Sequence, residues 1–328
     1  MMGYEPELAA GETRHDGPRA PWTGGRIALM VAGLGLLGAA LGGGWLALVA
    51  QGDLGLSAFT ALALSVVALV LLVGGLLLLL GALGYYVLAP AFMGGGMAWH
   101  GVGSHRLIIA TTLLIVMLAN TVPGAYLYLA GVGEVRTPGG LLTAAFSIAI
   151  ALLVVTYLRF IRPGIVTARD LGLDWHRLPR LLGQGVAIGV GAMIVSGAIQ
   201  ATMRWLGVPQ TQLADLSYIR EFPLWAFLAV LFAGGILGPI AEELYFRGAV
   251  FGTYVRTRGP WVSYGVTSLV FATLHLNLPA LLPILALSLV LCFAYRRTGS
   301  IIPSMTAHAV NNCTAFCILY FARGVPGV

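Results

Sequence analysis

Long, unbroken apolar stretches recur through this sequence and constrain its fold more than any other feature. The first two run over residues 27–50 and 57–88. Inside a lipid bilayer the backbone must satisfy its own hydrogen bonds, so only helices and closed barrels can span it. Because the apolar runs are continuous rather than alternating, they predict helices. The low charge content of 9% agrees with this interpretation, since soluble domains carry about 25% charged residues.

Helix-breaking residues and gaps in hydropathy divide the chain into about nine expected spans. The 223–256 segment is too long for one straight span, and its Gly234-Gly235 and Gly238-Pro239 pairs predict a bend. The expected fold is an all-α, polytopic transmembrane helical bundle in the cell membrane. The expected spans are 27–50, 57–88, 107–131, 140–158, 181–203, 223–256, 261–277, 279–295 and 300–322.

The arginines predict how this bundle is oriented. Thirteen of the 18 arginines lie in the N-terminal tail or in loops that would share its side of the membrane, and four lie on the opposite side. Positively charged residues are enriched in cytoplasmic loops, so this bias predicts a cytoplasmic N-terminus and an outward-facing C-terminus. The remaining arginine, Arg247, lies inside an expected span. Since the other positive charges lie in the tail and loops, the net charge of +6 does not indicate a nucleic-acid partner.

Polar segments predict the domain organisation. Residues 1–26 are polar and contain glycine and proline, so they are expected to form a disordered cytoplasmic tail. They lack the apolar region of a signal peptide. A polar cytoplasmic loop at 159–180 then separates two membrane regions. The region before it, 27–158, is expected to be an accessory four-helix part. The region after it, 181–328, is expected to be the functional core.

Ionisable side chains enter the expected spans only in this C-terminal region. They are two adjacent glutamates, Glu242 and Glu243, with Arg247, His275 and His308. A charged side chain at the bilayer centre costs at least about 2.5–3.5 kcal/mol on insertion scales, so each one needs a partner or a function. Three of these residues lie at similar depth on three separate spans. At helical rise, Glu242, His275 and His308 lie about 21, 22 and 16 Å from the inner surface. Polar contacts between helices are the alternative explanation, but the matched depth favours a site.

Helical spacing separates the roles of these residues. Glu243 and Arg247 are four residues apart, so they share a helix face and are expected to pair as structural support. Glu242 points about 140° away from Arg247 on an ideal helix, which leaves its carboxylate available for chemistry. His308 and Asn312 are also four residues apart and present an imidazole and an amide on one face.

These residue types fit peptide hydrolysis, which needs a base next to the water and hydrogen-bond donors for the oxyanion. A zinc site is the alternative, with Glu242, His275 and His308 as three ligands and an open fourth position. Zinc-bound imidazoles normally need second acceptors that orient them, and the spans offer few of these because Glu243 is expected to be taken by Arg247. The sequence therefore favours a catalytic site without a metal or another cofactor, with zinc as the alternative.

Three motifs resemble those of the CAAX-processing and bacteriocin-processing (CPBP or Abi) family of intramembrane proteases. They read EELYFR at 242–247, FATLH at 271–275 and HAVNN at 308–312, and the similarity covers about residues 170–322. The resemblance implies a glutamate-dependent endopeptidase of a family historically called metalloproteases. It implies that Glu242 activates water and that His275 helps to hold this water. It also implies that His308 and Asn312 bind the carbonyl oxygen of the substrate. The expected substrate is a membrane-associated protein or peptide, which could be a prenylated C-terminus, a bacteriocin or other leader peptide, or a membrane-protein segment.

Two other functions compete with this interpretation. One is a transporter or proton relay, because intramembrane Glu and His also mark ion paths. An inverted repeat would favour transport, but the polar motifs occur only in the C-terminal region. The other is a non-enzymatic immunity or scaffold protein of the membrane, against which the intact set Glu242, His275, His308 and Asn312 argues.

Overall fold

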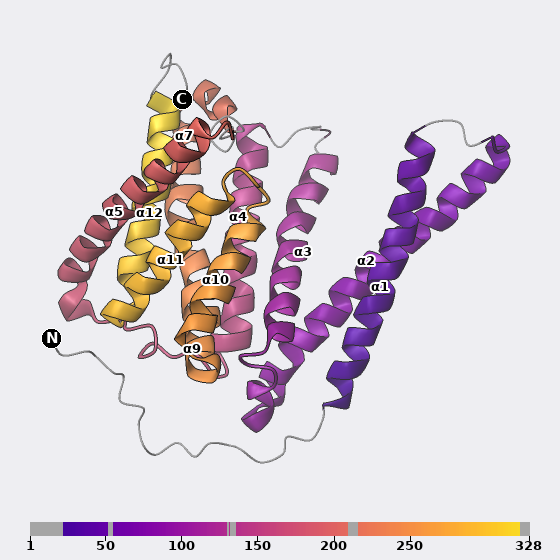
Figure 1. The fold of residues 1–328 in the computed structure, drawn as a ribbon. Coiled ribbons are helices and arrows are strands. Elements are labelled where there is room, and N and C mark those ends of the chain that lie inside the picture. The colour runs from indigo at the N-terminus through magenta and orange to yellow at the C-terminus, as the bar shows by residue number, and fades with distance from the viewer. Residues whose placement is uncertain (1–21, 52–54, 130, 132–135, 209–215, 322–328) are drawn as a thin grey trace. The chain divides into compact units, whose positions relative to one another are not determined.

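The computed structural model describes residues 22–51, 55–129, 131, 136–208 and 216–321, which form helices and turns without any strand (Figure 1). The predicted all-α class is therefore confirmed. Most of the predicted tail, residues 1–21, lies outside this described part, and its last residues form the first turn of α1. The longer helices are α1 (Thr23–Ala50), α2 (Ala58–Met93), α3 (His105–Leu129), α4 (Pro138–Thr156), α5 (Leu178–Trp205), α10 (Pro260–Leu274), α11 (Leu281–Thr298) and α12 (Ile302–Phe321).

A helical segment lies at each of the nine predicted positions, and seven candidate spans are long and apolar enough to cross a membrane. This confirms a multi-pass membrane protein. Two of the nine predicted spans are not among these seven candidates. One is α10, which has 15 residues and reaches only about 22 Å, less than the thickness of the hydrocarbon core. The other, α12, has 20 residues, but His308, Asn311 and Asn312 lower its apolar character. The seven candidates are Thr23–Ala50, Ala58–Met93, His105–Ala125, Pro138–Ile161, Trp175–Trp205, Leu224–Arg258 and Leu281–Thr298.

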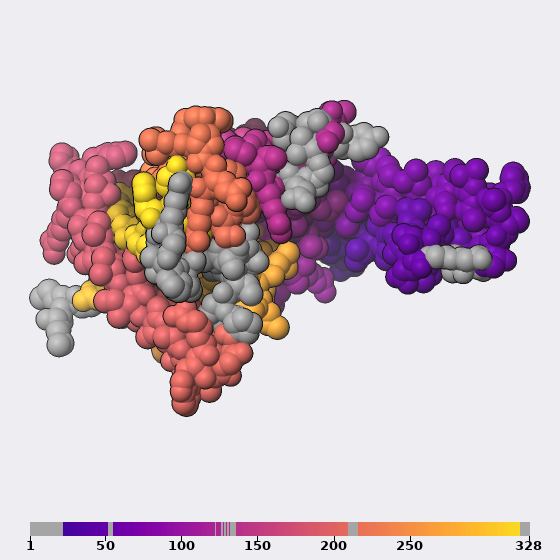
Figure 2. All heavy atoms as spheres, turned by 90° about the horizontal axis from the view of Figure 1, so that it is seen from above, coloured from indigo at the N-terminus to yellow at the C-terminus, as the bar shows by residue number. Residues whose placement is uncertain are grey.

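The described chain forms two compact units, and the boundary between them runs through α3. One unit contains α1, α2 and the part of α3 up to Met117, and the other contains the chain from Leu118 onward together with residues 101–105. In the first unit α1 and α2 pack directly against each other (Figure 2). Small residues allow this, because a Cβ on Gly42 would collide with the carbonyl oxygen of Ala68. The sequence predicts that α4 belongs with the three preceding helices. In the structure, α4 contacts α7, α8 and η6 of the second unit.

Within the second unit, α5 packs closely along α12. A Cβ on Gly189 would come within 3.0 Å of the Ala307 carbonyl oxygen, so this crossing depends on a small residue in α5. Buried Ala192, Leu287, Leu291 and Ala307 form a core where α5, α11 and α12 meet. This packing holds α12 against the helices on either side.

One long helical segment, Leu224–Arg258, changes its helical type along its length. It interrupts its α-helical geometry where the glycine and proline pairs predict a bend. Two π-helical segments flank the short helix α8, and π-helical turns are often found at functional sites. The successive parts are α7 (Leu224–Phe232), η5 (Ala233–Leu237), α8 (Gly238–Glu243), η6 (Leu244–Phe251) and α9 (Gly252–Arg258).

The polar loop 159–180 is anchored to the second unit by several hydrogen bonds. Leu171 accepts a backbone hydrogen bond from Ile301 at 2.9 Å, and the Tyr295 hydroxyl donates to the Asp170 carbonyl at 2.8 Å. The Asp170 carboxylate pairs with Arg256 at 3.2 Å. The loop is thus tied to α9, to α11 and to the start of α12.

Gly172 fixes the close contact between this loop and the α11–α12 turn. Its φ is +61°, and a Cβ at this position would collide with the Gly299 carbonyl oxygen. We therefore expect Gly172→Ala to lower the melting temperature of the purified protein more than Gly164→Ala does. Gly164 is the matched control, because its φ is +75° but nothing lies within 4 Å of the added Cβ. Gly164→Ala should cost only the left-handed backbone penalty of about 1–2 kcal/mol, and equal melting temperatures for the two variants would contradict this packing.

Candidate active site

The local geometry around the two glutamates follows from Pro239 and the glycines before it. Proline has no N–H, so the Gly235 carbonyl loses its usual helical donor, and π-helical η5 forms there. Side chains of α12 donate to the carbonyls of η5 instead. The Asn312 amide reaches Gly234 at 3.3 Å, and the Cys313 thiol reaches Gly235 at 3.4 Å. The interrupted helix therefore binds α12 directly beside α8.

Glu243 and Arg247 form the predicted ion pair in the interior of the second unit. The Arg247 Nη1 atom lies 2.7 Å from Glu243 Oε1, and both side chains are 0% exposed. Arg247 also donates through Nη2 to the Ser288 hydroxyl at 2.9 Å, and its guanidinium lies 4.6 Å from the centre of the Phe271 ring. These contacts from α11 and α10 hold the arginine and, through it, the Glu243 carboxylate.

The same Glu243 oxygen binds His308, which the sequence did not predict. His308 Nδ1 lies 2.9 Å from Glu243 Oε1, and the imidazole is 2% exposed. A carboxylate can only accept, so Nδ1 carries a proton and Nε2 faces away from Glu243. Arg247 is therefore not the sole partner of Glu243 as expected, because the same carboxylate oxygen accepts from both Arg247 and His308. Glu243 fixes the orientation of the His308 ring.

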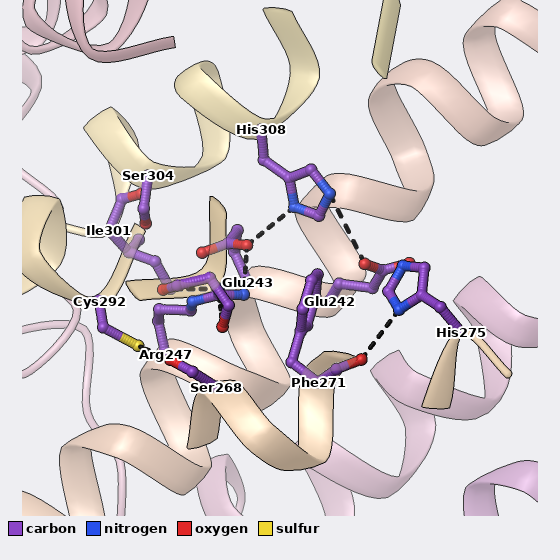
Figure 3. A network of polar contacts seen from close by, with 11 residues as sticks. Glu242, Glu243, Arg247, Ser268, Phe271, His275, Cys292, Ile301, Ser304 and His308 are labelled. Carbon is purple, nitrogen blue, oxygen red and sulfur yellow. Dashed lines mark hydrogen bonds and ion pairs between the residues drawn. The ribbon is translucent and has the colours of Figure 1, made fainter. Parts of the chain in front are cut away.

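The Glu242 carboxylate has one close ion-pair partner, His308, and its Oε2 atom makes no hydrogen bond within the described chain. Its Oε2 atom lies 3.7 Å from His308 Nε2, beyond hydrogen-bond distance, and its side chain is 22% exposed. Oε2 itself is buried and has no hydrogen-bond partner within the described chain. Figure 3 shows the Glu242 carboxylate turned toward His308 and His275. The role of this carboxylate in chemistry stays a prediction from the spacing of the motif.

His275 ends α10, and its side chain satisfies one of the last carbonyls of that helix. Its Nδ1 atom lies 2.8 Å from the Phe271 carbonyl oxygen, which can only accept, so Nδ1 carries the proton. In the neutral ring Nε2 is then an acceptor. The next residue, Leu276, has a φ of +49°, the left-handed conformation that often follows a helix end. The hydrogen bond to Phe271 thus holds His275 with Nε2 as its acceptor nitrogen.

Three of the four predicted catalytic residues, His275, His308 and Asn312, line one cavity of about 70 Å³. The fourth, Glu242, lies beside it, within 3.7 Å of His308. The cavity also contains polar residues that sequence analysis missed, namely Ser196, Gln200 and Asn311. Their signal in the sequence is an uncharged polar side chain in an apolar span, which is weaker than the signal of an ionisable group.

The fit of the site to a metal ion is mixed. Across the described residues, no group of three His, Cys, Asp or Glu side chains has an arrangement that could hold a metal, and this includes Glu242, His275 and His308. Both imidazoles, however, have the acceptors that zinc sites require, Glu243 for His308 and the Phe271 carbonyl for His275. Such acceptors are therefore present for both imidazoles, contrary to the expectation from the sequence.

Comparison with known proteins matches the segment that contains this site. A family model described as type II CAAX prenyl endopeptidase Rce1-like matches residues 223–314. YpbD, an uncharacterised protein of Bacillus subtilis, is 32% identical over 165 residues, which cover 47% of this chain and 77% of YpbD. YdiL of Bacillus subtilis, provisionally named a membrane peptidase, is 27% identical over 129 residues, 39% of this chain and 51% of YdiL.

A third relative is the UPF0177 protein YxdF of Lactococcus lactis, which is 33% identical over 79 residues, 24% of this chain and 43% of YxdF. The chain thus spans about half the length of YdiL and less than half of YxdF. No solved structure matches the chain.

Proposed function

We propose that this chain, which belongs to the type II CAAX prenyl endopeptidase Rce1-like family, is an intramembrane endopeptidase in which Glu242 activates water. The observation that carries the proposal is the Glu242 carboxylate, whose Oε2 atom makes no hydrogen bond within the described chain, beside a cavity lined by His275, His308 and Asn312. The substrate would be a membrane-associated protein or peptide, either with a prenylated C-terminus or with a leader sequence that is removed.

In this mechanism Glu242 takes one proton from the attacking water, and His275 Nε2 accepts a hydrogen bond from the O–H that the water keeps, which orients it. The water oxygen attacks the substrate carbonyl, and the proton on Glu242 then passes to the leaving nitrogen. Because the Asn312 amide uses one N–H for Gly234, its second N–H remains available for the oxyanion. His308 can donate to the oxyanion only through Nε2, because its Nδ1 atom donates to Glu243.

Identification of the substrate is the direct test of this function. Membranes that contain the wild-type protein or the Glu242→Gln variant would be compared by mass spectrometry of newly formed peptide termini. Termini that depend on Glu242 are expected, and the cleaved sequences would separate a prenylated C-terminus from a leader peptide. Identical sets of termini in both membranes would contradict the proposed function.

Asn312 is expected to stabilise the transition state rather than to bind the substrate. Asn312→Leu should lower kcat by about 10²–10³-fold with little change in KM, which is the typical effect of losing one oxyanion donor. The measurement is steady-state kinetics in lipid nanodiscs with a substrate peptide found by the terminus comparison. Cys313→Ala is the matched control, because Cys313 contacts the same π-helical segment but does not line the cavity. A kcat for Asn312→Leu equal to that of this control would remove Asn312 from the mechanism.

We further propose that catalysis requires no bound metal, since an oxyanion site built from amide and imidazole donors does not need a cation. Activity is therefore expected to survive exhaustive chelation, measured together with elemental analysis of the active protein. Stoichiometric zinc, with activity lost on its removal and restored by its return, would contradict this proposal. Glu242, His275 and His308 would then be the metal ligands.

A further inference from the structure

We infer that Gln200 of α5 and Asn311 of α12 bind the backbone of the substrate peptide next to the reacting bond. This inference rests on the proposed peptidase function and extends it from the catalytic groups to substrate binding. It is carried by the position of Gln200 on α5, by the orientation of two neighbouring amides, and by the composition of the cavity.

Gln200 lies on the face of α5 that packs against α12. Gly189 approaches Ala307 on this face, and Ser196 further along it is buried and donates to the Pro283 carbonyl at 3.4 Å. Gln200 follows Ser196 by four residues and therefore continues the same face. Both residues line the cavity of His275 and His308. The side chain of Gln200 is thus directed to the site rather than to lipid.

The hydrogen bonds of Asn312 determine which polar atoms face the cavity. The Gly234 carbonyl can only accept, so the Asn312 nitrogen faces Gly234 and its oxygen faces Asn311. The Asn311 nitrogen then donates to this oxygen at 3.3 Å, and the Asn311 oxygen is left as an acceptor. The Gln200 amide lines the same cavity, is half-buried, and can both donate and accept.

This pair of amides matches the chemistry of a peptide backbone. A substrate segment must be extended for its carbonyl to reach Glu242, and extension leaves N–H and C=O groups without helical partners. In the membrane each unsatisfied group costs several kcal/mol, so a protease has to supply hydrogen bonds for them. The Asn311 oxygen can accept from a backbone N–H, and Gln200 can bind both an N–H and a carbonyl.

The test measures peptide binding separately from catalysis. The full-length Glu242→Gln protein in nanodiscs would be titrated with a fluorescent Leu-Ala repeat peptide and with the same peptide N-methylated along its backbone. Gln200→Leu in this background should weaken binding of the unmethylated peptide about tenfold, the equivalent of one lost hydrogen bond. N-methylation should weaken binding to the parent protein more than binding to Gln200→Leu, in which only Asn311 of this pair remains to accept from a backbone N–H.

Thr202→Val is the matched control, because Thr202 is an exposed polar residue of α5 that donates to its own helix at Ala198, 2.9 Å away. It should bind the peptide like the parent, and all variants should retain the parent's melting temperature. Three results would each overturn the inference: no binding by the parent, equal binding by Gln200→Leu, or a loss that N-methylation affects equally in both proteins. Loss of Glu242-dependent cleavage with this binding pattern intact would count against the proposed function alone.

Discussion

Replacement of Glu242 by glutamine is expected to lower turnover by about 10²–10⁴-fold, the usual contribution of a general base. Glutamine has nearly the same shape but cannot take a proton from water. The change should leave the fold intact, because the Oε2 atom of Glu242 makes no hydrogen bond within the described chain and lies 3.7 Å from His308. Turnover would be measured in nanodiscs, with the melting temperature and the elution profile as checks of folding.

Two further variants sharpen this prediction. Glu221→Gln is the control, because Glu221 is an exposed glutamate that ends the short helical turn η4 (Ser217–Glu221), away from the cavity residues. It should leave turnover nearly unchanged. Glu242→Asp keeps the carboxylate but shortens its reach, so it should retain more activity than Glu242→Gln. Full activity of Glu242→Gln would remove Glu242 from the mechanism.

Replacement of the neighbouring Glu243 by glutamine is expected to act mainly on stability. It leaves Arg247 buried without a carboxylate, and breaking a buried ion pair in this way costs about 3–5 kcal/mol. Both partners are 0% exposed and 2.7 Å apart, so water cannot compensate for the lost charge. The free energy of unfolding would be measured by denaturant titration in mixed micelles, with Glu242→Gln as the matched control at the adjacent position.

A double variant separates the charge effect from the orientation of His308. Adding Arg247→Met to Glu243→Gln removes the unpaired cation and should recover part of the lost stability. Activity should remain low, because the uncharged amide oxygen of glutamine holds the His308 ring more weakly than the carboxylate oxygen that lies 2.9 Å from its Nδ1 atom. The buried-pair account fails if Glu243→Gln unfolds at the same denaturant concentration as the wild type. It also fails if the double variant is no more stable than the single one.

Much of the site could be predicted because the cost of burying charge is a local property of the sequence. Glu242, His275 and His308 are noticeable in apolar spans, and Asn312 follows His308 by one helical turn. Gln200 and Asn311 were missed because uncharged amides are less costly in a span and are common contacts between helices. Only the cavity they line distinguishes them from such contacts.

The all-helical class and the positions of the helices were determined by the sequence alone, since hydropathy and helical spacing depend on residues close together in the chain. The Glu243–Arg247 pair belongs to the same category, because its partners are one turn apart. The second partner of Glu243 was decided only by the tertiary structure. Glu243 and His308 are 65 residues apart, and they meet because η5 lets α12 approach α8 closely. No local pattern encodes that approach, because it depends on which faces of separate helices pack together.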